Sequence, residues 1–368
     1  MNIERIKPAL WPAHGGQAAA LLARFGLPAD HPLIDFSASI NPLGLPDWLP
    51  ERLTELAGGL VRYPQPDCRT AREAIAREHG VSPKQVLPTN GSAEAIFLTA
   101  AAHRDRRALV VQPTFSEYVR ACRAYGLPVR DFMLEGPDFC REPAGLADAI
   151  EADTLLFVCR PNNPTATLMP RSAVERLLMH AAQRGARVVV DEAFVDLSLD
   201  PNESLVPLLR RFDNLILLRS LTKYFALPGL RLGYVLAAEP VVRELAALQP
   251  PWSVNHLAAE LVAPLLADRS YQRRTRQWLE SEQPRMQQAL ATAGLQVVPS
   301  RTAFFLAQPE AGAQATDECF ERLLHNGILA RHTHGFPGLD GGWLRFALRD
   351  SADNERLLSA LCAAGRSP

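Results

Sequence analysis

The chain has 368 residues, of which 47% are hydrophobic, and a formal net charge of -1. This composition is ample for a core and predicts two domains, or one large domain with an appendage, while the balanced charge argues against a nucleic-acid-binding surface. No apolar stretch is long enough to span a bilayer, the N-terminus lacks a signal-peptide pattern, and the six cysteines include no C-x-x-C pair. We therefore expect a soluble cytoplasmic protein.

Residues 1–50 are rich in proline and glycine and predict an extended arm, interrupted by one short helix from about Gln17 to Phe25. Two stretches of the arm, at residues 14–16 (HGG) and 35–44 (DFSASINPLG), place an imidazole, hydroxyls and an amide where the backbone can approach a ligand closely. Turn formation is the more common role of any single serine or asparagine in such stretches. We expect the arm to pack on a small domain and the active site.

From about residue 80 to 240 the pattern alternates between apolar runs and helical segments, which is typical of a doubly wound α/β domain. Before it, an amphipathic helix is expected around Thr70 to His79. The apolar runs predict buried strands at 108–111, 154–159, 187–190, 214–218 and 233–236. Polar clusters follow the strands, at the edge where open α/β sheets hold their ligands. We place this large domain at residues 51–255.

Two polar clusters lie on either side of the first of these strands. Gly91 and Ser92 begin a helix, where backbone amides and a hydroxyl can cradle a phosphate, although the same residues are ordinary capping chemistry. Phe115 follows the strand, and its ring either lies flat against an aromatic ligand or belongs to the core.

Two more clusters follow the next pair of strands. Asn163, which precedes a proline, can donate a hydrogen bond to a ring phenolate oxygen. Asp191 comes directly after an apolar strand, and a buried carboxylate there needs a cationic partner. A protonated pyridine nitrogen would serve, and the alternatives are a helix cap or an internal salt bridge. Glu192 is expected to face solvent or an interface.

The stretch from Ser220 to Tyr234 places Lys223 where a strand gives way to a loop. The hydroxyls of Ser220 and Thr222, together with Arg231, supply donors that suit a phosphate monoester. An amine beside phosphate donors suggests pyridoxal phosphate, which a lysine binds as a Schiff base. The alternative is a surface lysine beside a structural arginine.

Residues 256–368 are expected to form an interdomain helix and a small α+β domain. A long helical stretch runs from Ala258 to Ala293, and strands are predicted at 297–306 and 342–348.

Two arginines of this last region are candidates for binding anions. The planar guanidinium groups of Arg331 and Arg345 suit carboxylates and phosphates, although from the residues alone each is a surface arginine. His332 and His334 have no third ligand nearby in the sequence, so we expect no metal.

Six motifs occur in a fixed order: N-G-S-x-E, P-T-F, P-N-N-P-T, D-E-A-F, S-x-T-K and R-L-G-Y. Together they resemble the fold type I pyridoxal-phosphate enzymes, the class I/II aminotransferase family, over essentially the whole chain after residue 30. The resemblance implies an α/β fold with a large, doubly wound, mainly parallel sheet domain and a small α+β domain. It implies that Lys223 binds the cofactor, that Asp191 contacts the pyridine nitrogen, and that Asn163 contacts the ring phenolate. Phe115 would stack on the ring. The residues implied around the cofactor phosphate are Gly91, Ser92, Ser220, Thr222 and Arg231.

The same resemblance implies a homodimer with shared active sites. Tyr63, in an R-Y-P tripeptide, would reach the cofactor phosphate of the other subunit. Phe194 departs from the family pattern, because many relatives, including histidinol-phosphate aminotransferases, have a tyrosine there whose hydroxyl helps hold the ring phenolate. Its absence leaves that contact to Asn163.

The HGG, DFSASINPLG and DEAFVDL stretches are similar to the branch of this family that decarboxylates L-threonine O-3-phosphate in cobalamin biosynthesis. That branch typically has H-G-G-N and S-A-N-I-N-P-L-G, so Gln17 and Ser39 depart from it. The similarity implies decarboxylation to (R)-1-amino-2-propanol O-phosphate. The implied substrate contacts are His14, Gly15, Ser39, Asn41, Asn163, Arg331 and Arg345, with Arg345 near the carboxylate.

Three alternatives stay open. A histidinol-phosphate or other aminotransferase would share every cofactor residue. A decarboxylase of O-phosphoserine would differ only by a methyl pocket, which is worth roughly 1–3 kcal/mol of discrimination. A non-enzymatic regulator built on this fold would carry a DNA-binding domain, for which we see no room and no basic helix-turn-helix stretch.

Overall fold

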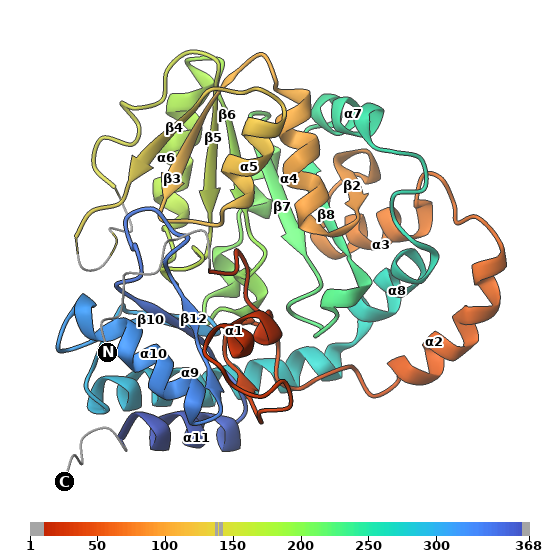
Figure 1. Cartoon of the computed structure of the whole chain (residues 1–368). Helices are drawn as coiled ribbons and strands as arrows, with labels where there is room; N and C mark the ends of the chain where they lie inside the picture. Colours follow the sequence, from red (N-terminus) through yellow and green to blue (C-terminus); the bar gives the residue numbers. More distant parts are fainter. Residues whose placement is uncertain (1–10, 137–138, 140–142, 363–368) are drawn as a thin grey trace, which may run out of the picture.

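The computed structural model describes residues 11–136, 139 and 143–362, and its largest unit is a seven-stranded sheet (Figure 1). The strands follow the order β2 (Val86–Thr89), β8 (Gly233–Ala237), β7 (Leu215–Ser220), β6 (Arg187–Asp191), β5 (Thr154–Cys159), β3 (Arg107–Gln112) and β4 (Val129–Met133). Neighbours from β7 to β4 pair in parallel, whereas β8 is antiparallel to both β7 and β2. The predicted mainly parallel sheet is therefore confirmed.

All five strands predicted from apolar runs belong to this sheet, but the sequence patterns do not reveal β2 and β4. β2 contains Pro88, and β4 is a partly exposed edge strand that includes Arg130 and Asp131. Proline and charged residues are depleted in strands, so these two segments give a weak strand signal.

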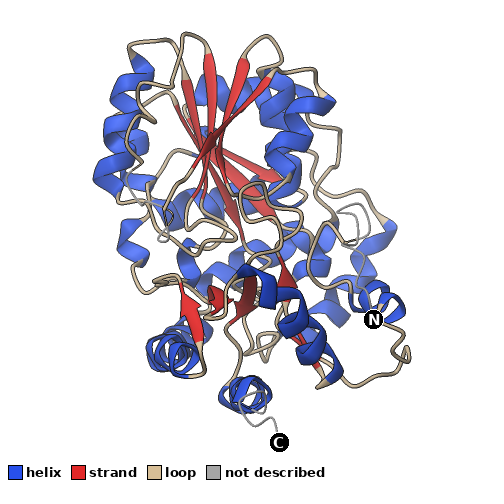
Figure 2. Ribbon diagram, turned by 60° about the vertical axis from the view of Figure 1, so that its left-hand side comes forward, coloured by secondary structure: helices blue, strands red, loops and turns tan. Residues whose placement is uncertain are grey.

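Helices cover both faces of the sheet, which twists between them (Figure 2). One apolar core includes residues of α2 (Leu49–Ala57), α3 (Arg69–His79), α6 (Arg171–Ala182) and α8 (His256–Ala267). The other includes residues of α4 (Gly91–Ala102), α5 (Glu117–Ala124) and α7 (Glu239–Leu248). Strand β5 serves both, since Leu156 and Val158 belong to the first core and Leu155 and Phe157 to the second. This alternation is the two-residue period of a strand that is buried on both faces.

A second sheet has four antiparallel strands in the order β12 (Arg331–His332), β13 (Leu344–Ala347), β10 (Phe304–Pro309) and β9 (Leu295–Val297). Its core is shared with α9 (Arg269–Thr292), α10 (Thr316–His325) and α11 (Ser351–Cys362). The N-terminal segment joins the same core through α1 (Ala18–Arg24), and β1 (Ile34–Asp35) pairs in parallel with β11 (Ile328–Leu329). Both the N-terminal and the C-terminal part of the chain therefore contribute to this second layer.

Short 3-10 turns connect the main elements at Gly58–Val61, Pro83–Gln85, Val195–Leu197, Pro201–Glu203, Val206–Arg210, Pro228–Leu230 and Ala313–Ala315. Among the described residues, no helix is both long and apolar enough to cross a membrane.

The prediction of one continuous helix from Ala258 to Ala293 is wrong, because the helix is interrupted at Asp268, between α8 and α9. Asp268 has non-helical dihedral angles (φ -76°, ψ 79°), and its carboxylate accepts a hydrogen bond of 2.8 Å from the Tyr271 backbone amide. The other carboxylate oxygen accepts from Trp48 Nε1 at 2.7 Å. An aspartate followed by a polar run is a helix start signal, and here it outweighs the continuous helical pattern.

The predicted strand at 297–306 is only partly correct, because β10 begins at Phe304. The hydroxyl of Ser300 donates to the Phe304 carbonyl at 2.8 Å and accepts from the Thr302 amide at 3.1 Å. Serine side chains compete for backbone groups in this way and favour turns over strands.

Replacing Asp268 by alanine is expected to lower the free energy of unfolding by about 1–2 kcal/mol, because α9 loses its N-terminal cap. Asp268→Asn keeps a cap acceptor and is the matched control, with an expected loss of less than about half as much. Urea unfolding of both variants measures the difference. Equal losses in the two variants would show that the cap does not stabilise this break.

Candidate active site

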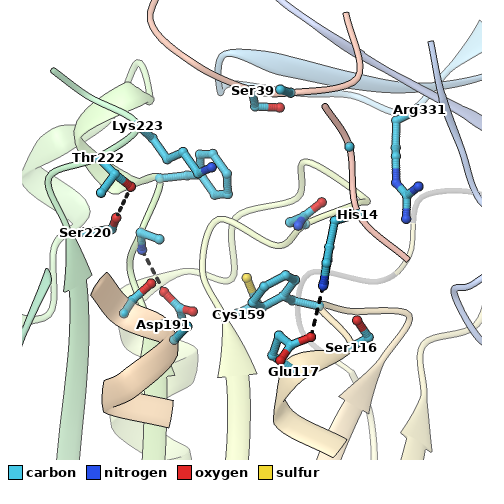
Figure 3. A pocket seen from close by; sticks show the side chains of 18 of the residues that line it. His14, Ser39, Ser116, Glu117, Cys159, Asp191, Ser220, Thr222, Lys223 and Arg331 are labelled. Atoms are coloured by element: carbon cyan, nitrogen blue, oxygen red, sulfur yellow. Dashed lines mark hydrogen bonds and ion pairs between the residues drawn. The ribbon is translucent and has the colours of Figure 1, made fainter. Parts of the chain in front are cut away.

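A cavity of about 390 Å³ lies at the carboxyl ends of β5, β6 and β7, where the large sheet faces the four-stranded sheet (Figure 3). The loops of adjacent parallel strands converge at this edge, which is why such sheets bind ligands there. The predicted site residues that line the cavity are His14, Gly15, Ser39, Ser92, Phe115, Asn163, Asp191, Ser220, Thr222, Lys223, Arg231, Arg331 and Arg345. Sequence motifs that are far apart in the chain therefore meet in one place.

One end of the cavity is built for close approach of backbone and small side chains. Gly91, at the start of α4, has φ +76°, and a Cβ atom there would lie 2.5 Å from Nη2 of Arg231. A Cβ atom on Gly233 would lie 2.5 Å from the Ser92 backbone nitrogen. Ser220 and Thr222 lie beside them, with their hydroxyl oxygens 2.8 Å apart. Hydroxyls, a guanidinium and the N-terminus of a twelve-residue helix form a site that suits a phosphate group.

Asp191 ends β6 with its side chain buried in the cavity wall. One carboxylate oxygen accepts from the Ala193 amide at 2.9 Å, and the other accepts from the Tyr118 hydroxyl at 2.9 Å. Burial raises the pKa of Asp191 to about 6, against the opposing effect of these two donors. Within the described part of the chain this carboxylate forms no ion pair, so a cationic ligand atom would be stabilised beside it.

Lys223 projects into the cavity just beyond the end of β7 (Figure 3). Burial, and then the positive charges of Arg345 and Arg231, lower the pKa of Lys223 to about 8. The amine is therefore partly neutral, and nucleophilic, within a unit or so of neutral pH.

Arg331 and Arg345 are direct cross-strand partners on β12 and β13. Burial lowers the pKa of Arg331 to about 10, and burial together with the charge of Arg331 lowers that of Arg345 to about 9. In the described residues neither guanidinium forms an ion pair with a carboxylate. Two like charges opposite each other are destabilising, so this pair marks a place where an anion would be bound strongly.

Each arginine is fixed by neutral acceptors. Arg331 donates to the carbonyls of Pro12 and Ala13, at 2.9 and 2.6 Å. Arg345 donates to the Ser37 carbonyl at 2.5 Å and to Oδ1 of Asn163. Because its carbonyl oxygen is taken, Asn163 keeps its amide nitrogen as the donor for a ligand.

Three predicted site residues are not part of the cavity lining. Asn41 was expected around the substrate phosphate, but its amide is buried and donates to the Tyr224 carbonyl at 2.9 Å and to Thr275 Oγ1 at 2.8 Å. Gly91 lies close to the guanidinium of Arg231, which does line the cavity. Tyr63 is 81% exposed and packs against Trp252, with ring centroids 4.7 Å apart. The backbone amide of Asn41 also donates to the Lys223 carbonyl. These hydrogen bonds of Asn41 therefore hold its loop against the backbone at Lys223 and Tyr224.

The prediction that Glu192 faces solvent or an interface is wrong as regards solvent, because Glu192 is only 1% exposed. Its carboxylate accepts from Arg160 at 3.1 Å and from Arg219 at 2.9 Å. In turn, Nη2 of Arg219 donates to both carboxylate oxygens of Asp196, and Arg160 pairs with Glu203. The two arginines lie 32 and 27 residues from Glu192 in the chain, so no local sequence pattern indicates this pairing.

Sequence reasoning overlooks two residues of the same QPTFSEY motif that supplied Phe115. Tyr118 is buried between aromatic rings and donates to Asp191. Glu117 pairs with Nε2 of His14 at 3.1 Å (Figure 3). Both residues follow Phe115 within three positions and lie in the first turn of α5, at the carboxyl end of β3. Because ligands bind at this edge of the sheet, that position is the signal that could have revealed them.

The residues fit pyridoxal phosphate. A helix start with two hydroxyls and an arginine suits its phosphate, a buried carboxylate without an ion pair in the described structure suits its pyridine nitrogen, and a partly neutral lysine suits its aldehyde. The fold and this donor set together define a protein of the aminotransferase type. The model of the aminotransferase class I and II family matches residues 31–361, and the chain belongs to this family.

Within the family, the chain is 37% identical to threonine-phosphate decarboxylase of Salmonella typhimurium over 353 residues, 95% of either protein. It is 32% identical to a histidinol-phosphate aminotransferase of Desulfitobacterium hafniense, over 89% of this chain and 91% of that protein. The crystal structure of L-threonine-O-3-phosphate decarboxylase from Porphyromonas gingivalis matches with a TM-score of 0.78 and 28% identity, covering 90% of this chain and 99% of that chain.

Replacing Glu192 by alanine is expected to lower the free energy of unfolding by about 3–5 kcal/mol, because two buried arginines lose their shared carboxylate. Urea unfolding of the apoprotein measures the loss. The control is Glu55→Ala, which breaks an exposed pair with Arg52 and should cost at most about 1 kcal/mol. A comparable small loss for both variants would contradict a structural role of the buried pairs.

Labelling of Lys223 by trinitrobenzenesulfonate in the apoprotein should reach half its maximal rate near pH 8, because only the neutral amine reacts and its pKa is lowered to about 8. A lowered pKa means that labelling rises at lower pH than for an ordinary lysine. Peptide mass spectrometry after digestion measures the site and its rate. In urea the midpoint should move up toward the ordinary value of 10.5, and an unchanged midpoint would contradict the shift.

Proposed function

We propose that this protein is a pyridoxal-phosphate-dependent carboxy-lyase that converts L-threonine O-3-phosphate to (R)-1-amino-2-propanol O-phosphate for cobalamin biosynthesis. The observation that carries the proposal is the buried pair Arg331 and Arg345, which lines the cavity in addition to the phosphate cradle. Two guanidinium groups suit a substrate with both a phosphate and a carboxylate. Similarity to threonine-phosphate decarboxylases over nearly the whole chain supports this substrate.

When bound, pyridoxal phosphate supplies an electron sink for the substrate Cα bond that stands perpendicular to its ring. Asp191 would hold the pyridine nitrogen, Asn163 the phenolate, and Phe115 one face of the ring. The cofactor phosphate would be held by Gly91, Ser92, Ser220, Thr222 and Arg231. Phe194 is buried and has no hydroxyl to share the contact with the phenolate.

The choice of the bond to be broken would follow from the substrate's anchoring points. Arg331, with His14, Gly15 and Ser39, would hold the substrate phosphate, and the Ser39 hydroxyl is buried without a partner in the described structure. Arg345 would lie near the carboxylate. A decarboxylase must turn the carboxylate out of the ring plane, so the phosphate contacts have to dominate the orientation.

Lys223 would also serve as the proton carrier. Its Nζ has a pKa of about 8, so it can hold a proton at neutral pH and would deliver it to the substrate Cα in place of the carboxylate that leaves as carbon dioxide. The neutral form, which is populated at the same pH, can then react as an amine. One side chain therefore can serve both as acid and as nucleophile.

We also infer a homodimer with shared active sites. Leu60, Val61 and Tyr63 are 58%, 86% and 81% exposed, and Trp252 beside Tyr63 is 45% exposed. Large apolar side chains that cluster on a surface are typical of protein interfaces. Tyr63 would then reach the cofactor phosphate of the other subunit. We also propose the division that the sequence pattern predicts, into an arm at 1–50, a large domain at 51–255 and an interdomain helix with a small domain at 256–368; residues 1–10 and 363–368 lie outside the described residues.

The purified holoenzyme is expected to release carbon dioxide from L-threonine O-3-phosphate without forming glutamate from 2-oxoglutarate. Lys223→Ala should reduce the rate by at least about 10³-fold, because it removes the nucleophile and the proton carrier together. Coupled assays of carbon dioxide and glutamate measure both reactions. Lys84→Ala, which breaks a surface pair with Glu239, is the matched control and should keep the wild-type rate.

Glutamate formation without carbon dioxide release would overturn the proposal in favour of an aminotransferase of the histidinol-phosphate type. Faster decarboxylation of O-phosphoserine than of L-threonine O-3-phosphate would keep the reaction but change the substrate.

A further inference from the structure

Glu117 is a carboxylate in the wall of a cavity whose other charged side chains are mostly cationic. It lies in the first turn of α5, is only 7% exposed, and lines the cavity together with Lys223, Arg331 and Arg345. A buried carboxylate beside a bound phosphate would weaken binding unless a cation compensates it. Neither the proposed cofactor contacts nor the proposed substrate contacts use Glu117.

The carboxylate of Glu117 is contacted from two sides. From the cavity side, Nε2 of His14 lies 3.1 Å from Oε1. From outside, Nη1 of Arg120 donates to both carboxylate oxygens, at 3.4 and 3.2 Å, and the Arg120 side chain is largely exposed. Only the contact with His14 therefore lies between the carboxylate and the interior of the cavity.

The segment that carries His14 is held elsewhere by the part of the chain next to the four-stranded sheet. Arg331 of β12 binds the carbonyls of Pro12 and Ala13, and the Gly16 amide donates to Oγ of Ser37 at 2.8 Å. The fit is tight, because a Cβ atom on Gly15 would lie 2.1 Å from the Ser37 carbonyl oxygen. Among the described contacts of residues 11–16, the pair with Glu117 is the ion pair that ties this segment to the large-sheet side of the cavity.

We propose that Glu117 is a positioning residue for the phosphate-bearing substrate, an inference that rests on the proposed function. Its contact with Nε2 of His14, at 3.1 Å, holds the imidazole across the cavity beside Arg331. In return, His14 covers the carboxylate, so that the substrate phosphate meets the imidazole and not the anion behind it. The two side chains therefore act as one unit in substrate binding.

This arrangement predicts a specific non-additivity. His14→Gln removes the imidazole and uncovers the Glu117 carboxylate next to the substrate phosphate. Glu117→Gln in the same chain removes that repulsion, so the double variant should bind substrate better than His14→Gln alone. Contacts that merely pack the segment in place would give no such rescue.

The test is a double-mutant cycle on KM and kcat of the holoenzyme with L-threonine O-3-phosphate. We expect Glu117→Gln to raise KM about fivefold, His14→Gln to raise it more, and the double variant to fall about tenfold below the product of the two single effects. In Glu117→Gln, kcat should stay within about twofold of wild type, because Glu117 touches no reacting atom. Glu321→Gln is the matched control, since Glu321 pairs with His325 at 3.9 Å on the exposed face of α10. Its KM should not change.

Calorimetry with ethanolamine phosphate and with ethanolamine separates this inference from the proposed function. The same non-additivity should appear in the affinity for the phosphorylated ligand and not in that for ethanolamine. If the wild-type protein releases no carbon dioxide but the coupling for ethanolamine phosphate is present, the proposed reaction fails and the role of Glu117 stands. Additive effects of the two substitutions, a fall in kcat without a change in KM, or no binding of ethanolamine phosphate by the wild type would each overturn the role.

Discussion

The shared salt bridge of Glu192 with Arg160 and Arg219 is the interaction on which the cavity depends. These three residues lie at the carboxyl ends of β5, β6 and β7, the strands whose ends carry Asn163, Asp191 and Lys223. A buried ion pair stabilises little in itself, because desolvation of the charges offsets their attraction. Its geometric requirement is strict, however, because Glu192 binds both arginines and each arginine also binds a second carboxylate, Glu203 or Asp196. The network thus fixes the spacing of three strand ends and of the chemistry attached to them.

The second layer of the molecule places cationic side chains on the other side of the cavity. The arginines of β12 and β13 and the segment around His14 all reach the cavity from the side of the four-stranded sheet. The strand ends of the large sheet carry the groups suited to the cofactor, and the side of the four-stranded sheet carries those suited to substrate anions. The groups proposed to hold the cofactor and those proposed to hold the substrate anions therefore lie mostly on different layers, which would allow them to change separately.

The sequence predicts best where a residue's role is set by its immediate neighbours. Apolar runs reveal the buried strands β3, β5, β6, β7 and β8, and short motifs reveal the residues that line the cavity. It predicts poorly where the deciding partner is distant in the chain. Nothing near Glu192, Glu117 or Asn41 indicates Arg160, His14 or Thr275 as its partner. The break at Asp268 is an intermediate case, since a local capping signal competes with a continuous helical pattern.

The scarcity of lysine gives Lys223 a further chemical meaning. Lys7, Lys84 and Lys223 are the three lysines of a chain that has 39 basic residues, so its surface cations are nearly all guanidinium groups. Guanidinium groups stay protonated and do not compete as amines for a carbonyl compound. An aldehyde therefore meets few competing lysine side chains on this protein, and Lys223, which lies in the cavity, has a lowered pKa. Chemoselectivity toward a carbonyl reagent is therefore a property of the composition of the whole chain as well as of the active site.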